Sequence, residues 1–209
     1  MSTEDTTAPN PRLPFFEALS ERWDAIYDAG RARPLLAAGL ARHGVGPAEH
    51  VVDLGCGTGV LLGVLGEHLG PQGRIEAVDL APAMIARAQR KFPDPRIRFH
   101  VADVCALPLA DGAVDRVLCF SAWPHFPDPD AAIAELARVL RPGGRLHIWH
   151  IDSRATINHI HQTADPAVAH DLLEPAADLA ARLQAAGLTV TSQQDDDQAY
   201  ELVAHTPAG

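Results

Sequence analysis

The stretch Val51-Val52-Asp53-Leu54-Gly55-Cys56-Gly57-Thr58-Gly59 decides the fold of this 209-residue chain. It leads from an apolar strand into a helix through a turn with a glycine at every second position. Such glycines let the chain reverse sharply, let a ligand touch bare backbone, and aim helix N–H groups at polar ligand atoms. A Walker loop is excluded, because no Gly-Lys-Ser/Thr follows. The turn predicts a nucleotide-like ligand, although a purely structural glycine turn would have a similar pattern.

On both sides of this turn, apolar strand segments alternate with amphipathic helical segments. The expected strands are 50–55, 74–80, 96–103, 113–121, 145–152, 188–194 and 199–206. The expected helices are 15–29, 33–43, 58–70, 82–92, 129–141, 153–163 and 175–186. This alternation predicts an α/β fold with a mainly parallel sheet and helices on both faces. The last two segments, separated by the acidic turn at 195–197, predict a terminal hairpin.

Length and charge narrow the class of protein. A polar, proline-rich stretch at 1–14 predicts a disordered tail, and 15–209 is predicted to be one domain. The net charge of -10 argues against nucleic-acid binding, because an acidic surface repels phosphate. No apolar run approaches the roughly 20 residues of a membrane span. With no secretory signal and an odd number of cysteines, three in all, a cytoplasmic protein without a disulfide framework is expected.

Two further acids come at predicted strand ends. Asp79 ends the second strand about 20 residues after the glycines, where an acid accepts hydrogen bonds from ribose hydroxyls. Asp103 ends the third strand, where an acid is placed to receive the exocyclic amine of adenine. Together with Asp53, these acids meet in the crevice where open parallel sheets bind ligands. Solvated strand-end acids explain one such residue easily and three poorly, so we predict an adenosyl ligand.

Four segments resemble the sequential motifs of the class I S-adenosylmethionine-dependent methyltransferases. They are VVDLGCGTG at 51–59, AVDLAPAMIARAQRK at 77–91, FHVADVCALPLADGAVDRVLCF at 99–120 and ELARVLRPGGRLHI at 135–148. The resemblance is to the small-molecule branch that includes ubiquinone and menaquinone methyltransferases. It implies a Rossmann-like sheet of seven strands with an antiparallel last strand. It also implies a helical lid, here over 15–48, and S-adenosylmethionine as cofactor.

The resemblance further implies a set of cofactor-binding residues. The glycine turn would wrap the methionine part of the cofactor, Asp79 would hold the ribose hydroxyls, and Asp103 would meet the adenine. The end of the fourth strand would face the reacting methyl group. The complete predicted set is Asp53, Gly55, Cys56, Gly57, Gly59, Asp79, Leu80, Met84, Asp103, Val104 and Phe120.

The acceptor is expected near the ends of the fourth and fifth strands and the N-terminal helix. If the nucleophile is an alcohol, a phenol or an ammonium, the site needs a base, and His125 and His150 are the predicted candidates. His125 has the alternative interpretation of a loop histidine that caps the next helix. The residues predicted to contact a small-molecule substrate are Trp23, Tyr27, Trp123, Arg154, Asn158 and His161.

Several alternatives stay open from the sequence. His125, His150 and His161 could converge on a metal such as zinc, iron or nickel, although we favour a polar pocket with one catalytic histidine and no metal. Arg154 could pair with a substrate anion, or form a salt bridge with Asp152 or Asp171. A protein of this fold that binds S-adenosylmethionine without catalysis is the rival function. Oxygen, nitrogen, sulfur and carbon nucleophiles all fit the predicted fold as acceptor atoms.

Overall fold

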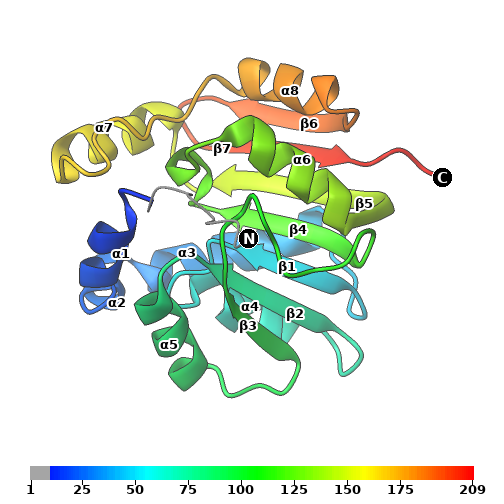
Figure 1. Ribbon diagram of the computed structural model, residues 1–209, viewed down its shortest axis with the longest axis horizontal. Coiled ribbons are helices and arrows are strands. Elements are labelled where there is room, and N and C mark those ends of the chain that lie inside the picture. Colours follow the sequence, from blue (N-terminus) through cyan, green and yellow to red (C-terminus); the bar gives the residue numbers. More distant parts are fainter. Residues whose placement is uncertain (1–9) are drawn as a thin grey trace, which may run out of the picture.

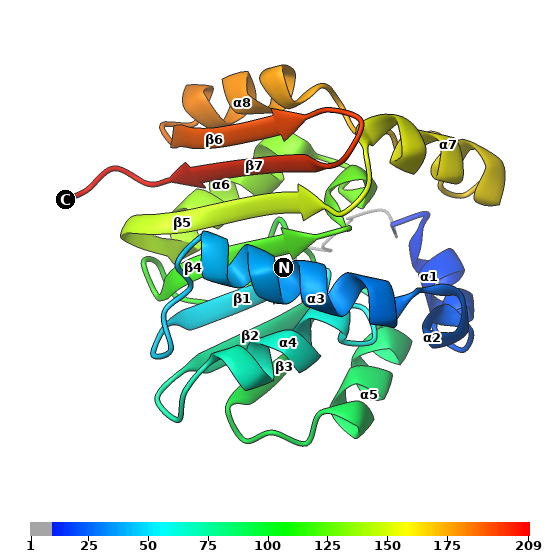
Figure 2. The same cartoon turned by 180° about the vertical axis from the view of Figure 1, so that it is seen from behind.

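The computed structural model describes residues 10–209, and residues 1–9 of the predicted tail lie outside the described residues. Seven strands form one sheet in the order β3-β2-β1-β4-β5-β7-β6 (Figures 1 and 2). They are β1 His50–Leu54, β2 Arg74–Asp79, β3 Ile97–Val101, β4 Val114–Phe120, β5 Leu140–His150, β6 Thr189–Asp195 and β7 Tyr200–His205. The strand order reverses between β1 and β4, which is where sheets of this kind bind ligands.

All strands run parallel except β7, which pairs antiparallel with both β5 and β6. The predicted Rossmann-like sheet of seven strands with an antiparallel last strand is therefore confirmed. The strand β5 begins at Leu140, earlier than expected, because Leu140 pairs with Val114 before the register shifts to Arg116 and Arg145. Residues 141–144, which lie between the expected helix and the expected strand, thus form an interruption inside β5, and Gly143 adopts a φ of 71° there.

Helices cover both faces of the sheet, and each face has its own apolar core. The helices α3, α4 and α5 pack on one face and α6 and α8 on the other, while α7 lies beyond the strand ends, near α1 and α2 (Figure 1). Their bounds are α1 Leu13–Leu19, α2 Trp23–Ile26, α3 Ala29–Arg42, α4 Val60–His68, α5 Pro82–Lys91, α6 Pro129–Val139, α7 Arg154–Ala164 and α8 Ala176–Ala185.

The N-terminal segment differs from the prediction of one helix over 15–29. The chain forms α1 and α2, and Ser20 begins the break by donating its hydroxyl to the carbonyl of Glu17 (2.7 Å). Asp28 then caps α3, because its carboxylate accepts the backbone N–H of Arg31 at 2.9 Å. This cap starts α3 at Ala29 rather than at the predicted residue 33. The predicted tail also ends earlier, because α1 begins at Leu13.

Candidate functional site

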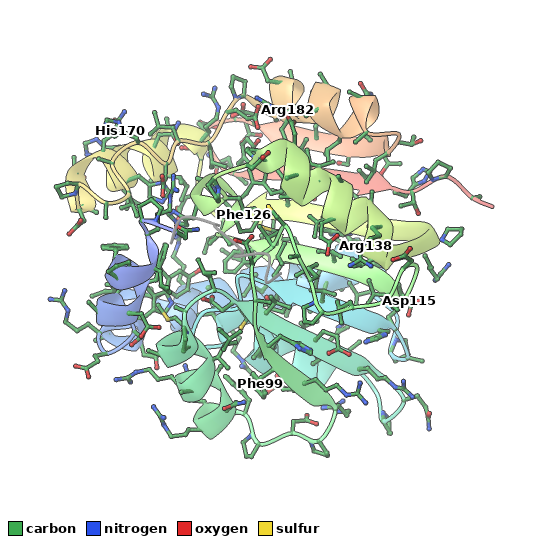
Figure 3. All side chains as sticks on the ribbon, in the orientation of Figure 1. Phe99, Asp115, Phe126, Arg138, His170 and Arg182 are labelled. Atoms are coloured by element: carbon green, nitrogen blue, oxygen red, sulfur yellow. The ribbon has the colours of Figure 1, made fainter. Side chains whose placement is uncertain are left out.

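A pocket opens at the carboxyl ends of β1, β2 and β4, where α1 and α2 close over it. The space inside it, open solvent included, is ≈ 790 Å³. Figure 3 labels Phe126, which lies on the pocket wall, and His170, which lies in the segment that follows α7. The wall consists of Asn10, Arg12, Phe16, Trp23, Leu54, Gly55, Gly57, Val78, Asp79, Leu80, Met84, Ala102, Asp103, Val104, Ser121, Ala122, His125, Phe126 and Pro127.

The glycine turn gives the pocket a wall of bare backbone. Gly55 has a φ of 69°, and a Cβ there would lie 2.4 Å from the Cβ of Ala122. Only glycine fits both this conformation and this space. The N–H groups of Gly55 and Cys56 both donate to the carbonyl of Val78 at 2.9 Å, so the turn is fixed to the end of β2. A ligand that needs to approach the backbone closely has room to do so here.

The two predicted strand-end acids both line the pocket. The carboxylate of Asp79 accepts the N–H of Gly57 at 2.8 Å and that of Ala81 at 2.9 Å. Burial raises the pKa of Asp79 above its usual value. Asp103 accepts the N–H of Cys105 at 2.9 Å. Each oxygen in these bonds retains a second lone pair, so both carboxylates remain able to accept hydrogen bonds from a ligand.

Asp53 lies beneath the pocket. It is 1% exposed, and its Oδ2 has no hydrogen-bond partner within residues 10–209. Burial, and then the charge of Asp79, raise the pKa of Asp53 to about 8. A buried, unpartnered acid is costly, and a cationic ligand in the pocket would favour its ionised form.

The predicted cofactor set divides into two groups. Gly55, Gly57, Asp79, Leu80, Met84, Asp103 and Val104 line the pocket, whereas Asp53, Cys56, Gly59 and Phe120 do not. Phe120 points to the opposite face of the sheet, where its ring packs against Trp149 at 5.9 Å between centroids. A Cβ on Gly59 would meet Phe92 at 2.4 Å, so this glycine serves the packing of α4 and not the pocket wall.

Of the two predicted bases, His125 lies on the pocket wall. It ends the short 3-10 helix η1 (Trp123–His125) that follows β4, and Ser121 turns the chain into it with a φ of 55°. The Nδ1 of His125 is 2.8 Å from Oδ2 of Asp171, which leaves Nε2 for a ligand. The alternative that His125 caps the next helix is wrong, because Asp128 caps α6 by accepting the N–H of Ala131 at 2.9 Å.

His150 is placed differently. It is 3% exposed, does not line the pocket, and packs against Tyr200 with ring centroids 6.0 Å apart. Neither of its ring nitrogens has a partner among the described residues. Burial, with smaller contributions from His125 and His161, lowers the pKa of His150 to about 3. A neutral, enclosed imidazole away from the pocket wall does not suit the role of a base.

Most of the predicted substrate residues have structural partners. Asn158 bonds the backbone of Leu173 twice, at 3.1 and 2.7 Å. Arg154 forms a salt bridge, but its partner is Asp195 at 2.9 Å rather than Asp152 or Asp171. His161 lies against His125, with ring centroids 4.8 Å apart, and is hydrogen-bonded to the backbone carbonyl of Asp171. These three side chains do not line the pocket.

The aromatic predictions also divide. Trp23 lines the pocket and stacks on Tyr27, with ring centroids 5.6 Å apart. Burial raises the pKa of the Tyr27 hydroxyl to about 12, so Tyr27 stays protonated behind the wall. Trp123 is 2% exposed and packs against Phe126.

Within residues 10–209, no three His, Cys, Asp or Glu side chains are arranged to hold a metal ion, so His125, His150 and His161 do not form the considered metal site.

The residues that the sequence did not indicate come mainly from the N-terminal cover, which we define as residues 10–26. Glu17 accepts the N–H of Ala83 at 2.9 Å, and Asp24 accepts the hydroxyl of Thr58 at 2.5 Å and bonds Lys91 at 2.8 Å. These bonds hold the cover on α5 and on the glycine turn. No local sequence signal indicates these bonds, because their partners lie 34 or more residues away.

Comparisons with known proteins agree with this geometry. The family model of a methyltransferase domain matches residues 52–148. Malonyl-[acyl-carrier protein] O-methyltransferase of Hahella chejuensis is 32% identical over 189 residues, which cover 81% of this chain and 67% of that protein. Demethylmenaquinone methyltransferase of Thermus thermophilus is 42% identical over 100 residues, 47% of this chain and 45% of that protein. An S-adenosyl-L-methionine-dependent methyltransferase structure from Methanococcus maripaludis shares the fold, with a TM-score of 0.72, 18% identity and coverage of 100% and 98%.

The chain therefore belongs to the class I S-adenosylmethionine-dependent methyltransferases, as its motifs predicted, and S-adenosylmethionine is the cofactor of this family. It spans less than half the length of the first curated relatives that it matches. Across residues 10–209, no helix combines the length and the apolar character needed to cross a membrane.

Proposed function

We propose that this chain is a cytoplasmic enzyme that transfers a methyl group from S-adenosylmethionine to a small-molecule acceptor, with His125 as the base. One observation carries the proposal: the glycine turn, Asp79, Asp103 and His125 all line a single pocket. The similarity to a demethylmenaquinone methyltransferase supports a small-molecule acceptor. The net charge of -10 argues against a nucleic-acid acceptor.

The residues present fit the cofactor. The backbone of Gly55 and Gly57 leaves space for its methionine part, and the carboxylates of Asp79 and Asp103 would hold the ribose and the adenine. Asp53, with an unpartnered oxygen beneath the turn, would offset the positive charge of the ligand. S-adenosylmethionine supplies the methyl group on an electrophilic sulfonium.

The protein's own contribution is to orient the acceptor, exclude water and take up a proton. Phe16, Trp23 and Phe126 give the pocket apolar walls that suit an apolar acceptor. His125 presents Nε2 to this space, because its Nδ1 bonds Asp171. A histidine base is required when the nucleophile bears a proton that must leave, as an alcohol, a phenol or an ammonium does. We therefore propose an O–H or N–H acceptor.

The test combines binding with transfer. Isothermal titration calorimetry should detect adenosylhomocysteine, and methyl-tritiated S-adenosylmethionine should label the small-molecule fraction of a cell extract. His125→Ala should reduce labelling roughly 100-fold or more while leaving adenosylhomocysteine affinity within a few-fold. His159→Ala, at an exposed position on α7, is the matched control. No binding of adenosylhomocysteine at millimolar concentration would refute the function, and full labelling by His125→Ala would refute the base.

A further inference from the structure

We propose that Asp171 is a positioning residue for His125 and that Arg12 links this pair to the N-terminal cover, so that closure of the cover completes the arrangement of the base. The inference rests on the proposed function, in which His125 takes up the acceptor proton. Neither Asp171 nor Arg12 belongs to the motifs of the family model, which ends at residue 148.

Asp171 is the centre of the arrangement. It is 2% exposed, and its Oδ2 accepts Nδ1–H of His125 at 2.8 Å and Nε–H of Arg12 at 2.7 Å. Its Oδ1 accepts Nη2–H of Arg12 at 2.5 Å. Burial alone would raise the pKa of Asp171, but the hydrogen bonds from His125 and Arg12 outweigh it and hold the pKa below the usual value. The buried group is therefore an ionised carboxylate with three donors.

An ionised carboxylate only accepts hydrogen bonds, so the ring nitrogen that faces Asp171 must carry a proton. This fixes Nδ1 of His125 as the donor, and in the neutral imidazole it leaves Nε2 with its lone pair toward the pocket. A base needs that tautomer, because a protonated Nε2 could not accept a proton. Without Asp171, both tautomers of the ring would be populated, and only one of them would be competent.

Other polar groups surround the ring without replacing this contact. His161 lies 4.8 Å from His125 between ring centroids, and its Nδ1 bonds the backbone carbonyl of Asp171 rather than the carboxylate. His150 and Asp79 interact with His125 only through longer-range charge effects. Among the described residues, Asp171 is thus the acidic side chain in hydrogen-bond contact with His125.

Arg12 makes the cover part of this arrangement. It immediately precedes α1, and one turn further along that helix the ring of Phe16 meets the edge of His125, with centroids 4.9 Å apart. If α1 left the pocket, Asp171 would lose two of its three donors and His125 would lose its aromatic neighbour. Closure of the cover therefore restores a neutralised carboxylate and a packed imidazole in one movement.

A second salt bridge near the N-terminus serves for comparison, because it joins distant segments without contacting the pocket. Arg31 pairs with Asp152 at 2.7 Å, with 51% and 28% of these side chains exposed, and neither residue lines the pocket. The Arg12 pair is the more buried of the two, and its carboxylate also bonds the pocket histidine. Arg31→Ala is therefore the matched control for Arg12→Ala.

The first experiment reads the tautomer of His125 by nitrogen-15 NMR of histidine-labelled protein with adenosylhomocysteine present. In the wild type, Nδ1 should carry the proton. In Asp171→Ala, a mixture of tautomers with a protonated Nε2 should appear, whereas Asp197→Ala should match the wild type. An unchanged tautomer in Asp171→Ala would overturn the positioning role.

A second measurement needs no Asp171 variant, in case that protein fails to fold. The Nδ1-bound proton of wild-type His125 should exchange slowly with water. Arg12→Ala should accelerate this exchange, and amide exchange of residues 13–19, roughly tenfold or more. Arg12→Lys should recover part of the protection, and Arg31→Ala should leave both rates unchanged.

Equal exchange in Arg12→Ala and Arg31→Ala would overturn the link to the cover. These readouts do not depend on turnover, so they separate failure of this inference from failure of the proposed function. A wild type that does not bind adenosylhomocysteine would refute the function, whereas binding with an undisturbed tautomer and undisturbed exchange in the variants would refute the inference alone.

Discussion

At the scale of single residues, the buried carboxyl of Asp53 links the pocket to pH. Its pKa of about 8 lies above the value of 3.8 that it has when the chain is unfolded. An acid whose folded pKa is raised binds its proton more tightly in the folded state, so it lowers stability as it ionises. The loss begins above the unfolded pKa, grows through the interval between the two values, and is complete above the folded one.

The first prediction concerns this dependence of the free energy of unfolding on pH. Asp53→Asn removes the titration, so the free energy of unfolding of the cofactor-free wild type should fall relative to the variant between pH 4 and pH 8. The difference should reach on the order of a few kcal/mol, because one pKa unit corresponds to about 1.4 kcal/mol. Urea unfolding at a series of pH values measures it. Parallel curves for the two proteins would contradict the prediction.

A second residue-scale prediction concerns Asp79. Its carboxylate holds the N–H groups of Gly57 and Ala81 and lines the pocket. Hydrogen bonds to charged groups contribute about 1.5–3 kcal/mol, so Asp79→Ala should weaken adenosylhomocysteine binding roughly 10- to 100-fold in calorimetry. Asp197→Ala, which changes an exposed acid between β6 and β7, should bind like the wild type. Equal affinities of all three proteins would remove Asp79 from the site.

At the scale of elements, the pocket depends on how closely the glycine turn approaches the segment after β4. Gly55 and Gly143 have nearly equal φ values, 69° and 71°, but an added Cβ meets Ala122 at 2.4 Å in the first case and nothing within 4 Å in the second. The two sites therefore separate the cost of a left-handed conformation from the cost of a collision.

The third prediction uses this pair. Gly143→Ala should lose about 1 kcal/mol of unfolding free energy from backbone strain, while Gly55→Ala should lose a further ~1–3 kcal/mol from overpacking. Gly55→Ala should also lose affinity for adenosylhomocysteine, because the two residues that would collide, Gly55 and Ala122, both line the pocket. Urea unfolding and calorimetry measure both effects. A Gly55→Ala protein as stable as Gly143→Ala would contradict the prediction, because it would show that the glycine turn and the segment after β4 accommodate the added methyl group without loss of stability.

Elements with strong periodicity were predictable from the sequence. The strands and the helices after residue 50 follow the predicted order, because alternating apolar segments and glycine stops carry that information locally. The cover did not follow, since Phe15 to Tyr27 keep helical spacing while Ser20 and Asp28 form local side-chain bonds that divide the segment. Such side-chain bonds compete with continuation of the helix, and they do not change the periodic spacing of apolar residues from which the helix was predicted.

The part of the site that depends on local sequence signals was predictable, and the part that depends on long-range contacts was not. Glycines and acids at strand ends are local signals, and Gly55, Asp79 and Asp103 line the pocket as expected. His150 was assigned by its place at a strand end, but strand alternation turned its side chain into the interior. Arg12 and Asp171 could not be predicted as site residues, because they are distant in the sequence. Their role depends on the contacts that the fold creates between them and with His125.

At the scale of the whole molecule, a second buried acid, on the central part of β2, also links stability to pH. Glu76 on β2 is 3% exposed and bonds Nε2 of His50 at 2.8 Å and Nε2 of His100 at 2.6 Å. The bond to Glu76 raises the pKa of His50 above 6.5. Burial would raise the pKa of Glu76, but the two histidines outweigh it and hold the pKa below 4.5.

The fourth prediction follows from the opposite directions of these two pKa shifts, upward for His50 and downward for Glu76. A histidine with a raised folded pKa adds stability that is fully present below its unfolded pKa and is lost as pH rises through the folded one. A glutamate with a lowered pKa adds stability above its unfolded value. The advantage of the wild type over His50→Gln should therefore be largest between pH 4.5 and 6.5 and should shrink above that range in urea unfolding. A constant difference up to pH 9 would contradict it.

The contact between Arg12 and Asp171 spans 159 positions of the chain, and this fixes the order in which the protein can be completed. On the ribosome, β1 to β5 emerge before residue 171, so the sheet that holds the glycine turn has its strands while Arg12 still lacks a partner. The strands that carry the glycine turn are therefore synthesised before Asp171, and the contact that ties residue 12 to this fold is made only after most of the sheet has been synthesised.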